Sequence, residues 1–186
     1  MNIIESERLR NNKTPTHLVW VDLEMTGLDT SVHRIVEVAV IITDFEFNEL
    51  ASYEAVISQS DEVLSASNEF SMFAHEKSGL YEAVRKSTIT ESQAEQAVID
   101  LITPLVPEGA VFLAGNSIRS DRSFIDTYWK SLSKLLHHRM LDVSSFKIWW
   151  LGSGNAEYQK CESHRALDDI RESMAELKFY LEEFKK

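Results

Sequence analysis

Cysteine, long apolar segments and basic charge are scarce in this sequence of 186 residues. Cys161 is the only cysteine, which excludes an internal disulfide and suits a reducing compartment, so we expect a cytoplasmic protein. No apolar run approaches the roughly 20 residues that cross a bilayer, and no membrane partner is expected. Lys and Arg number 19 against 30 Asp and Glu, a net charge of −11. Proteins that follow long nucleic acid strands usually have a basic surface, which this composition does not provide.

The start of the chain differs in character from the rest. Residues 1–16 are polar and aperiodic, and we interpret them as a flexible N-terminal arm before a single domain, residues 17–186. They lack the apolar core of a secretory signal, and Glu5 and Glu7 argue against an acid-poor transit peptide. A mitochondrial location is the alternative if a targeting segment once preceded this sequence.

The hydrophobic pattern predicts an α/β domain with a central mixed β-sheet flanked by helices. Strands are predicted at residues 17–25, 34–43, 50–58, 111–114 and 140–143. Helices are predicted as short segments within 61–87 joined at Ser78–Gly79, then at 90–106, 121–136 and 168–184. Thr90 is the expected N-cap of the second group, and Pro104 is expected to end that helix early. Three strands followed by alternating helices and strands indicate meanders first and crossovers later.

Acidic residues lie on or beside predicted strands and at the start of the last predicted helix, where they could bind a ligand or a metal ion. Asp22 and Glu24 lie two residues apart on the first predicted strand, so both carboxylates point to one face. Asp121 follows a predicted buried strand, a frequent place for ligands in open α/β sheets. Asp168 and Asp169 stand at the start of the last helix, where a carboxylate is favourable in any case. Taken alone, Asp22 with Glu24 is better explained by a solvated strand face, and Asp121 by stabilisation of a helix.

The acids are more informative as a set. Four carboxylates from three segments, the last from Asp168 or Asp169, could converge at a sheet edge and hold two divalent cations, Mg²⁺ or Mn²⁺. Two such ions can orient an attacking water and stabilise the leaving oxygen when a phosphodiester is cleaved. A nearby histidine such as His164 can accept the proton of the water. The cations would also supply positive charge where a phosphate must bind.

Three segments resemble the motifs of the DEDDh exonucleases: Val21–Asp29, Gly115–Asp121 and His164–Ser173. The sequence is most similar to the oligoribonuclease family, from about Leu18 to the C-terminus. The His-x-Ala-x-x-Asp spacing of the third segment selects Asp169 over Asp168. The resemblance implies an RNase H-like fold. It also implies a general base, His164, and the metal ligands Asp22, Glu24, Asp121 and Asp169.

The resemblance further implies a homodimer and a pocket closed around two nucleotides. The implied substrate-binding residues are Gly27, Leu28, Phe70, His75, Asn116, Ser117, Arg139 and Ser144. Leu28 would wedge at the bases, and His75 would lie near the scissile side. Ser117 would help to cap the 5′ phosphate, together with Arg139 and Ser144 from the neighbouring subunit. Phe70 stands where the family usually has a tryptophan that contacts a base, and it can still stack, with less aromatic area. His138 stands where the family usually has tyrosine.

Three functions are compatible with these features. The first is a 3′→5′ exoribonuclease that degrades short oligoribonucleotides, especially dinucleotides, to mononucleotides. The second is a broader exonuclease that trims longer RNA or DNA 3′ ends, and the third is an inactive RNA-binding or scaffold protein. The acidic composition favours the first over the second, because long strands require a basic track. The complete set of four acids and one histidine argues against the third.

Overall fold

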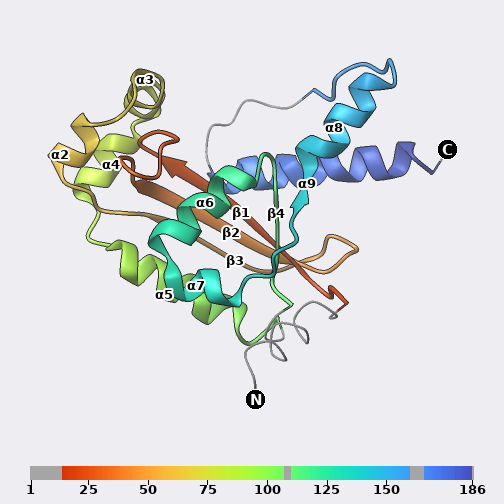
Figure 1. The fold of residues 1–186 in the computed structure, drawn as a ribbon, viewed down its shortest axis with the longest axis horizontal. Coiled ribbons are helices and arrows are strands. Elements are labelled where there is room, and N and C mark those ends of the chain that lie inside the picture. Colours follow the sequence, from red (N-terminus) through yellow and green to blue (C-terminus); the bar gives the residue numbers. More distant parts are fainter. Residues whose placement is uncertain (1–13, 107–109, 160–165, 186) are drawn as a thin grey trace.

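A mixed five-stranded sheet forms the centre of the protein, as the sequence predicts (Figure 1). The computed structural model describes residues 14–106, 110–159 and 166–185. The strand order is β3-β2-β1-β4-β5. The strands are β1 Leu18–Met25, β2 Ile35–Thr43, β3 Glu49–Val56, β4 Phe112–Gly115 and β5 Leu141–Asp142. The first three strands pair antiparallel, whereas β4 runs parallel to β1 and β5 parallel to β4. The carboxyl ends of β1, β4 and β5 therefore point the same way.

Burial along the strands reflects their places in the sheet. All nine residues of β2 are buried, because this strand is covered on both faces. In β1, Asp22 and Glu24 are half-buried while the apolar residues around them are buried. The edge strand β3 is mostly exposed or half-buried. The two acids of β1 thus lie in the middle of the sheet and not on a solvated edge.

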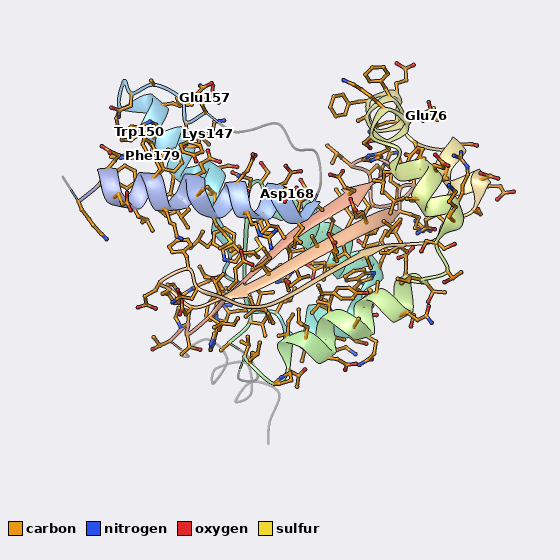
Figure 2. All side chains as sticks on the ribbon, turned by 180° about the vertical axis from the view of Figure 1, so that it is seen from behind. Glu76, Lys147, Trp150, Glu157, Asp168 and Phe179 are labelled. Carbon is orange, nitrogen blue, oxygen red and sulfur yellow. The ribbon has the colours of Figure 1, made fainter. Side chains whose placement is uncertain are left out.

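Two groups of helices cover the sheet. Helix α9, Ala166–Glu183, packs against β1, β2 and β4. Over the other side, three helices pack together: α5 Glu91–Ile102, α6 Arg119–Tyr128 and α7 Lys130–Leu135 (Figures 1 and 2). The predicted apolar stripe of α9 is confirmed at Ile170, Met174 and Leu177, which are buried, whereas Leu181 is half-buried. In the described part of the chain, none of the helices is both long and apolar enough to cross a membrane.

The segment between β3 and β4 forms three short helices and one longer helix. The short helices are α2 Asp61–Ser65, α3 Glu69–Ser78 and α4 Leu80–Lys86. Gly79 joins α3 to α4 with φ 77°, a left-handed conformation that glycine adopts without strain. Helix α5, Glu91–Ile102, begins at Thr90 with a capping box to Gln93. It ends two residues before Pro104, so the predicted early stop is confirmed.

The prediction of one helix over residues 121–136 is wrong. The structure has α6, Arg119–Tyr128, and α7, Lys130–Leu135. The break falls at Trp129, whose ψ of 66° leaves the helical region and whose side chain is buried. Glu95 of α5 stabilises the restart, because its Oε1 accepts the backbone N–H groups of Ser131 and Leu132.

The predicted strand over residues 140–143 is shorter than expected. Only Leu141 and Asp142 pair with β4, and Val143 already begins α8, Val143–Gly152. Asp142 caps α8 through a 2.9 Å hydrogen bond from the backbone N–H of Ser144. Helix α8 packs on α9, where the rings of Trp150 and Phe179 meet edge-on with centroids 5.3 Å apart (Figure 2).

Candidate active site

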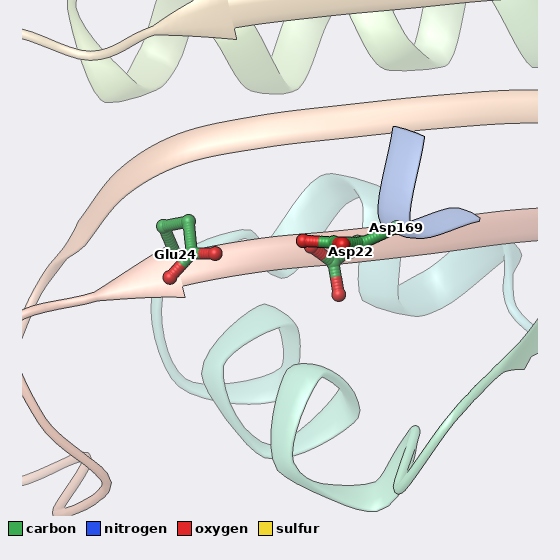
Figure 3. A group of neighbouring side chains, drawn as sticks. All are labelled: Asp22, Glu24 and Asp169. Carbon is green, nitrogen blue, oxygen red and sulfur yellow. The ribbon is translucent and has the colours of Figure 1, made fainter. Parts of the chain in front are cut away.

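Two carboxylates of β1 and one of α9 converge towards the carboxyl end of β1 (Figure 3). One carboxylate oxygen from each of Asp22, Glu24 and Asp169 lies within 4.8 Å of the other two. The alternation of β1 puts the first two on one face, and Asp169 lies in the first turn of α9. Asp168 is instead exposed and lies 3.7 Å from Arg171, so Asp169 is the acid of this pair that reaches the site.

Asp121 approaches the same site from α6. Strand β4 pairs with β1 only as far as Trp20, which leaves the next part of β1 without a strand partner on that side. Asp121 takes this place, because its Oδ1 accepts a 2.9 Å hydrogen bond from the backbone N–H of Leu23. The chain turns into α6 at Gly115, where a Cβ atom would lie 3.0 Å from the carbonyl oxygen of Val21. The close approach of this turn to β1 therefore favours glycine.

Buried acids in such proximity hold protons unusually tightly. Burial raises the pKa of Glu24 to about 7, and the charges of Glu37, Asp169 and Asp121 contribute to the rise. Burial also raises the pKa of Asp121 well above its usual value, with a further rise from the charge of Asp22. A bound cation would remove this cost, and hard oxygen ligands at this spacing suit a divalent ion. The donor set therefore fits the metal that the sequence predicts.

Glu37 was not identified from the sequence. It is buried on β2 directly opposite Glu24 in the antiparallel pair. A single glutamate within the otherwise apolar run of residues 35–42 is the signal that could have revealed it.

A cleft of about 880 Å³ opens beside Glu24. Its walls contain the predicted residues Gly27, Leu28, Phe70 and His75, which come from the turn after β1 and from α3. Leu28 is 71% exposed and Phe70 is 82% exposed, so both present most of their apolar surface to a ligand. The structure thus brings one carboxylate of the acidic cluster and the two predicted base-contacting residues to a single cleft.

Two hydrogen bonds fix α3 against the end of β1. The backbone N–H of Asn68, the N-cap of α3, donates to the carbonyl oxygen of Thr26 at 2.9 Å. The Nε2 atom of buried His75 lies 2.9 Å from the carbonyl oxygen of Met25, an arrangement in which Nε2 donates its proton. Burial lowers the pKa of His75, so the neutral ring is favoured. Its Nε2 is also 3.8 Å from Oε2 of Glu24, so His75 lies beside the acidic cluster.

The loop after β4 contains the predicted residues Asn116 and Ser117. The Asn116 amide donates to Oγ of Ser173 at 2.8 Å and to Oε2 of buried Glu176 at 3.1 Å. Its Oδ1 accepts from Oγ of Ser144 at 3.3 Å. Asn116 therefore connects α9 to α8 in the free protein. Ser173 and Glu176, which hold the Asn116 amide, were not identified from the sequence.

Ser144 lies beside Ser117 within one chain, with the two Oγ atoms 3.2 Å apart. The family resemblance predicts instead that a second subunit supplies Ser144 at this position. The parallel pairing of β4 and β5 explains the difference, because the residues that follow two neighbouring parallel strands meet at the same edge. The Ser117 backbone N–H is bonded to Ser144 Oγ and to Asp142 Oδ1, with Ser117 held at φ 50°.

Arg139 lies away from the acidic site of its own chain. It is exposed and lines a separate cavity of about 220 Å³ with Leu18 and Phe112, at the amino-terminal ends of β1 and β4. Leu18 precedes Glu24 by six residues, roughly 20 Å along a strand. His138, next to Arg139, is exposed and stacks on the buried His137 ring at 4.3 Å. The predicted general base, His164, lies outside the described residues.

The comparisons with known proteins agree with this geometry. Residues 19–177 match the family model described as an exonuclease. The chain belongs to the exonuclease family. Within it, the oligoribonuclease of Francisella tularensis subsp. novicida is 44% identical over 169 residues, covering 88% of this chain and 93% of the relative. The oligoribonuclease of Ectopseudomonas mendocina is 43% identical and covers 94% and 99% of the two chains.

Solved structures support the fold. Escherichia coli exonuclease I in complex with a dA16 oligonucleotide aligns with a TM-score of 0.63 at 14% identity. The alignment covers 87% of this chain but only 40% of exonuclease I, so this chain spans less than half of that protein. The predicted exonuclease fold and the resemblance to oligoribonuclease are both confirmed. As a member of this family, the chain is a 3′→5′ exoribonuclease, a hydrolase of phosphodiester bonds.

Proposed function

We propose that this exoribonuclease acts on very short RNAs, dinucleotides above all, and releases 5′-mononucleotides. The observation that carries the proposal is the single cleft that joins Glu24 to Leu28 and Phe70. A volume of about 880 Å³ is in the range of small-molecule sites and suits one or two nucleotides. The net charge of −11 offers no basic track for a longer strand. Enzyme relatives named oligoribonuclease support the same substrate class.

The acids would hold two divalent cations, Mg²⁺ or Mn²⁺, through Asp22, Glu24, Asp121 and Asp169. When bound, the cations help to orient the attacking water and offset charge on the leaving oxygen. His164 would accept the proton of that water. Leu28 and Phe70 would contact the bases, with Gly27 leaving room at the cleft wall and neutral His75 beside the scissile phosphate.

The 5′ end of the substrate would bind on the other side of the acids. Ser117 and Ser144 would contact the 5′ phosphate from the same chain, and Asn116 would hold their loop in place. Arg139 would come from the partner in a homodimer, because its own acidic site is too distant. Arginine suits a terminal phosphate, which its planar side chain can hold with two hydrogen bonds.

The same proposal includes the domain organisation and the cellular location of the enzyme. We take residues 17–186 as one exonuclease domain behind an N-terminal arm, in line with the family match over 19–177. The relatives named above are bacterial, and together with the single cysteine they support a cytoplasmic location.

Product analysis on a single substrate tests the proposed reaction. A 5′-phosphorylated RNA dinucleotide is incubated with the protein and Mg²⁺ or Mn²⁺, and the products are separated by chromatography. We expect two 5′-mononucleotides from each molecule, and none in excess chelator. A nucleoside with a 3′-phosphate as product, or full turnover in chelator, would contradict the proposal.

A further inference from the structure

The cleft wall formed by α3 carries two side chains to which no role has been given above, Phe73 and Lys77. Phe73 follows Phe70 by three residues and Lys77 follows Phe73 by four, so the three side chains share one face of α3. All three line the cleft that contains Glu24. Met72 lies on the other side of α3 and packs on the small core cluster around Val36 and Tyr81. The exposed row is therefore a feature of the cleft and not of the core.

Phe70 and Phe73 form an unusual apolar surface. Their exposed fractions are 82% and 70%, among the largest for any big apolar side chain in the described ranges. A single exposed phenylalanine needs no explanation, but two neighbouring ones on the wall of a cleft that contains a carboxylate cluster mark a surface for a ligand. The Asn68–Thr26 and His75–Met25 contacts hold this wall at a fixed place relative to Glu24. Its position relative to the acids is therefore preorganised.

Lys77 gives the same wall a positive charge. Among the described residues that line the cleft, Lys77 is the only lysine or arginine, whereas Glu24 and Glu37 are both present. In a chain with a net charge of −11, an anionic substrate approaches against repulsion. A cation on an exposed helix face at the cleft reduces this repulsion where the substrate enters.

We propose that Phe73 and Phe70 together form a two-ring wall for the nucleobase of the 3′-terminal nucleotide, and that Lys77 attracts the phosphates of the substrate. This inference rests on the proposed function. The phosphate to be cleaved lies at the acids, and Ser117 and Ser144 lie on the β4 side of them. Since the 5′ side of that phosphate faces Ser117 and Ser144, the nucleotide on its 3′ side occupies the cleft beside Glu24. Aromatic stacking accepts any base, as a general RNA-degrading enzyme requires.

Steady-state kinetics of Phe73→Ala test the base contact. With a dinucleotide substrate and saturating Mg²⁺, we expect KM to rise roughly tenfold with kcat nearly unchanged, the size expected for loss of one stacked base. The rise should be absent for a dinucleotide whose 3′ nucleotide lacks its base. Phe73→Tyr should restore the original KM. The matched control is Leu50→Ala, which removes an exposed apolar side chain from the far end of β3. Equal KM values for Phe73→Ala and Leu50→Ala would overturn the base contact.

Salt dependence tests the role of Lys77. Lys77→Gln should lower kcat/KM several-fold at low ionic strength, and the difference from wild type should vanish at high ionic strength. Lys130→Gln on α7, which changes the net charge equally at an exposed position, is the control. If both lysine variants behave alike, Lys77 has no special role.

Binding of 5′-AMP by calorimetry separates this inference from the proposed function. Phe73→Ala should weaken 5′-AMP binding relative to Leu50→Ala even if wild type failed to cleave dinucleotides. Absence of dinucleotide cleavage by wild type contradicts the proposed function, whereas unchanged 5′-AMP affinity in Phe73→Ala contradicts the two-ring wall. Since Phe73 is exposed, thermal unfolding should match wild type, and Phe73→Leu repeats the measurement if it does not.

Discussion

At the scale of single residues, the site depends on carboxylates that three separate segments of the chain bring together. The period of two along β1 places Asp22 and Glu24 on one face, and the spacing of the third motif selects Asp169. The bond from Leu23 N–H to Asp121 depends on where β4 ends, which no local pattern reveals. The pairing of Glu24 with Glu37 depends on strand register. Contacts between distant segments therefore account for what was missed.

Removal of any one acid should abolish catalysis. Asp22→Ala, Asp121→Ala and Asp169→Ala should each lose nearly all turnover, and double variants should be little worse, because the ligands act as one unit. The matched control is Asp168→Ala, which removes the neighbouring exposed acid and should keep most of the activity. Initial rates on an RNA dinucleotide, with circular dichroism to check the fold, provide the measurement. An Asp169→Ala variant as active as Asp168→Ala would remove Asp169 from the site.

The raised pKa of Glu24 predicts how the metal-free protein responds to pH. A carboxyl whose pKa rises from 4.5 to about 7 on folding stabilises the fold while it is protonated. This contribution is complete below the unfolded value and is lost as pH rises through about 7. Asp121 acts in the same direction. In chelator, the free energy of unfolding should therefore fall as the pH is raised from 5 to 8.

Urea denaturation in chelator at pH 5 and pH 8 measures this effect. Glu24→Gln should reduce the loss of stability between the two pH values, because a neutral amide has nothing to ionise. Added Mg²⁺ or Mn²⁺ should restore stability to wild type at pH 8 and do so less well at pH 5, where protons compete with the cation. An equal loss in wild type and in Glu24→Gln would show that Glu24 does not titrate in this range.

At the scale of secondary structure elements, periodicity and capping signals predict most of the order but not the breaks. The strands β1 and β2 and the N-cap of α5 follow from local patterns. The break at Trp129 does not, because it depends on burial of the indole and on Glu95 from α5. Helix α8 was also missed, since its start depends on the short pairing of β5 with β4.

Asn116 should act as a connection between elements. Asn116→Ala removes the side-chain hydrogen bonds to Ser173, Glu176 and Ser144. The buried Glu176 carboxylate then has one hydrogen-bond donor fewer. We expect a loss of roughly 1–3 kcal/mol of unfolding free energy and a lower kcat, because the bonds that join α9 to the Ser117 loop are lost. The control is Asn155→Ala, which removes one side-chain hydrogen bond, from the Asn155 amide to the carbonyl oxygen of Trp150, on an exposed loop. Urea denaturation and dinucleotide kinetics are the measurements. Equal stability and kcat in the two variants would contradict the role.

At the scale of the whole molecule, the position of Arg139 leads to a prediction about assembly. Within one chain Arg139 lies near the start of β1, away from the acids, and the proposed function therefore assigns it to the site of a partner chain. Asp22→Ala and Arg139→Ala chains should each be weakly active or inactive. After mixing and exchange, half of the dimers are mixed and each has one complete site, so about a quarter of wild-type activity should return. No recovery, with exchange verified by native mass spectrometry, would argue against the shared site.

The most direct test of the whole account is the dependence of rate on substrate length. Initial rates are measured on 5′-phosphorylated RNAs from two to about twenty nucleotides, with Mg²⁺, with Mn²⁺ and with excess chelator. A single cleft in an acidic chain predicts the highest kcat/KM for the dinucleotide, a steep fall with length and no activity in chelator. A rate that stays constant or rises with length would contradict the account and favour a broader exonuclease.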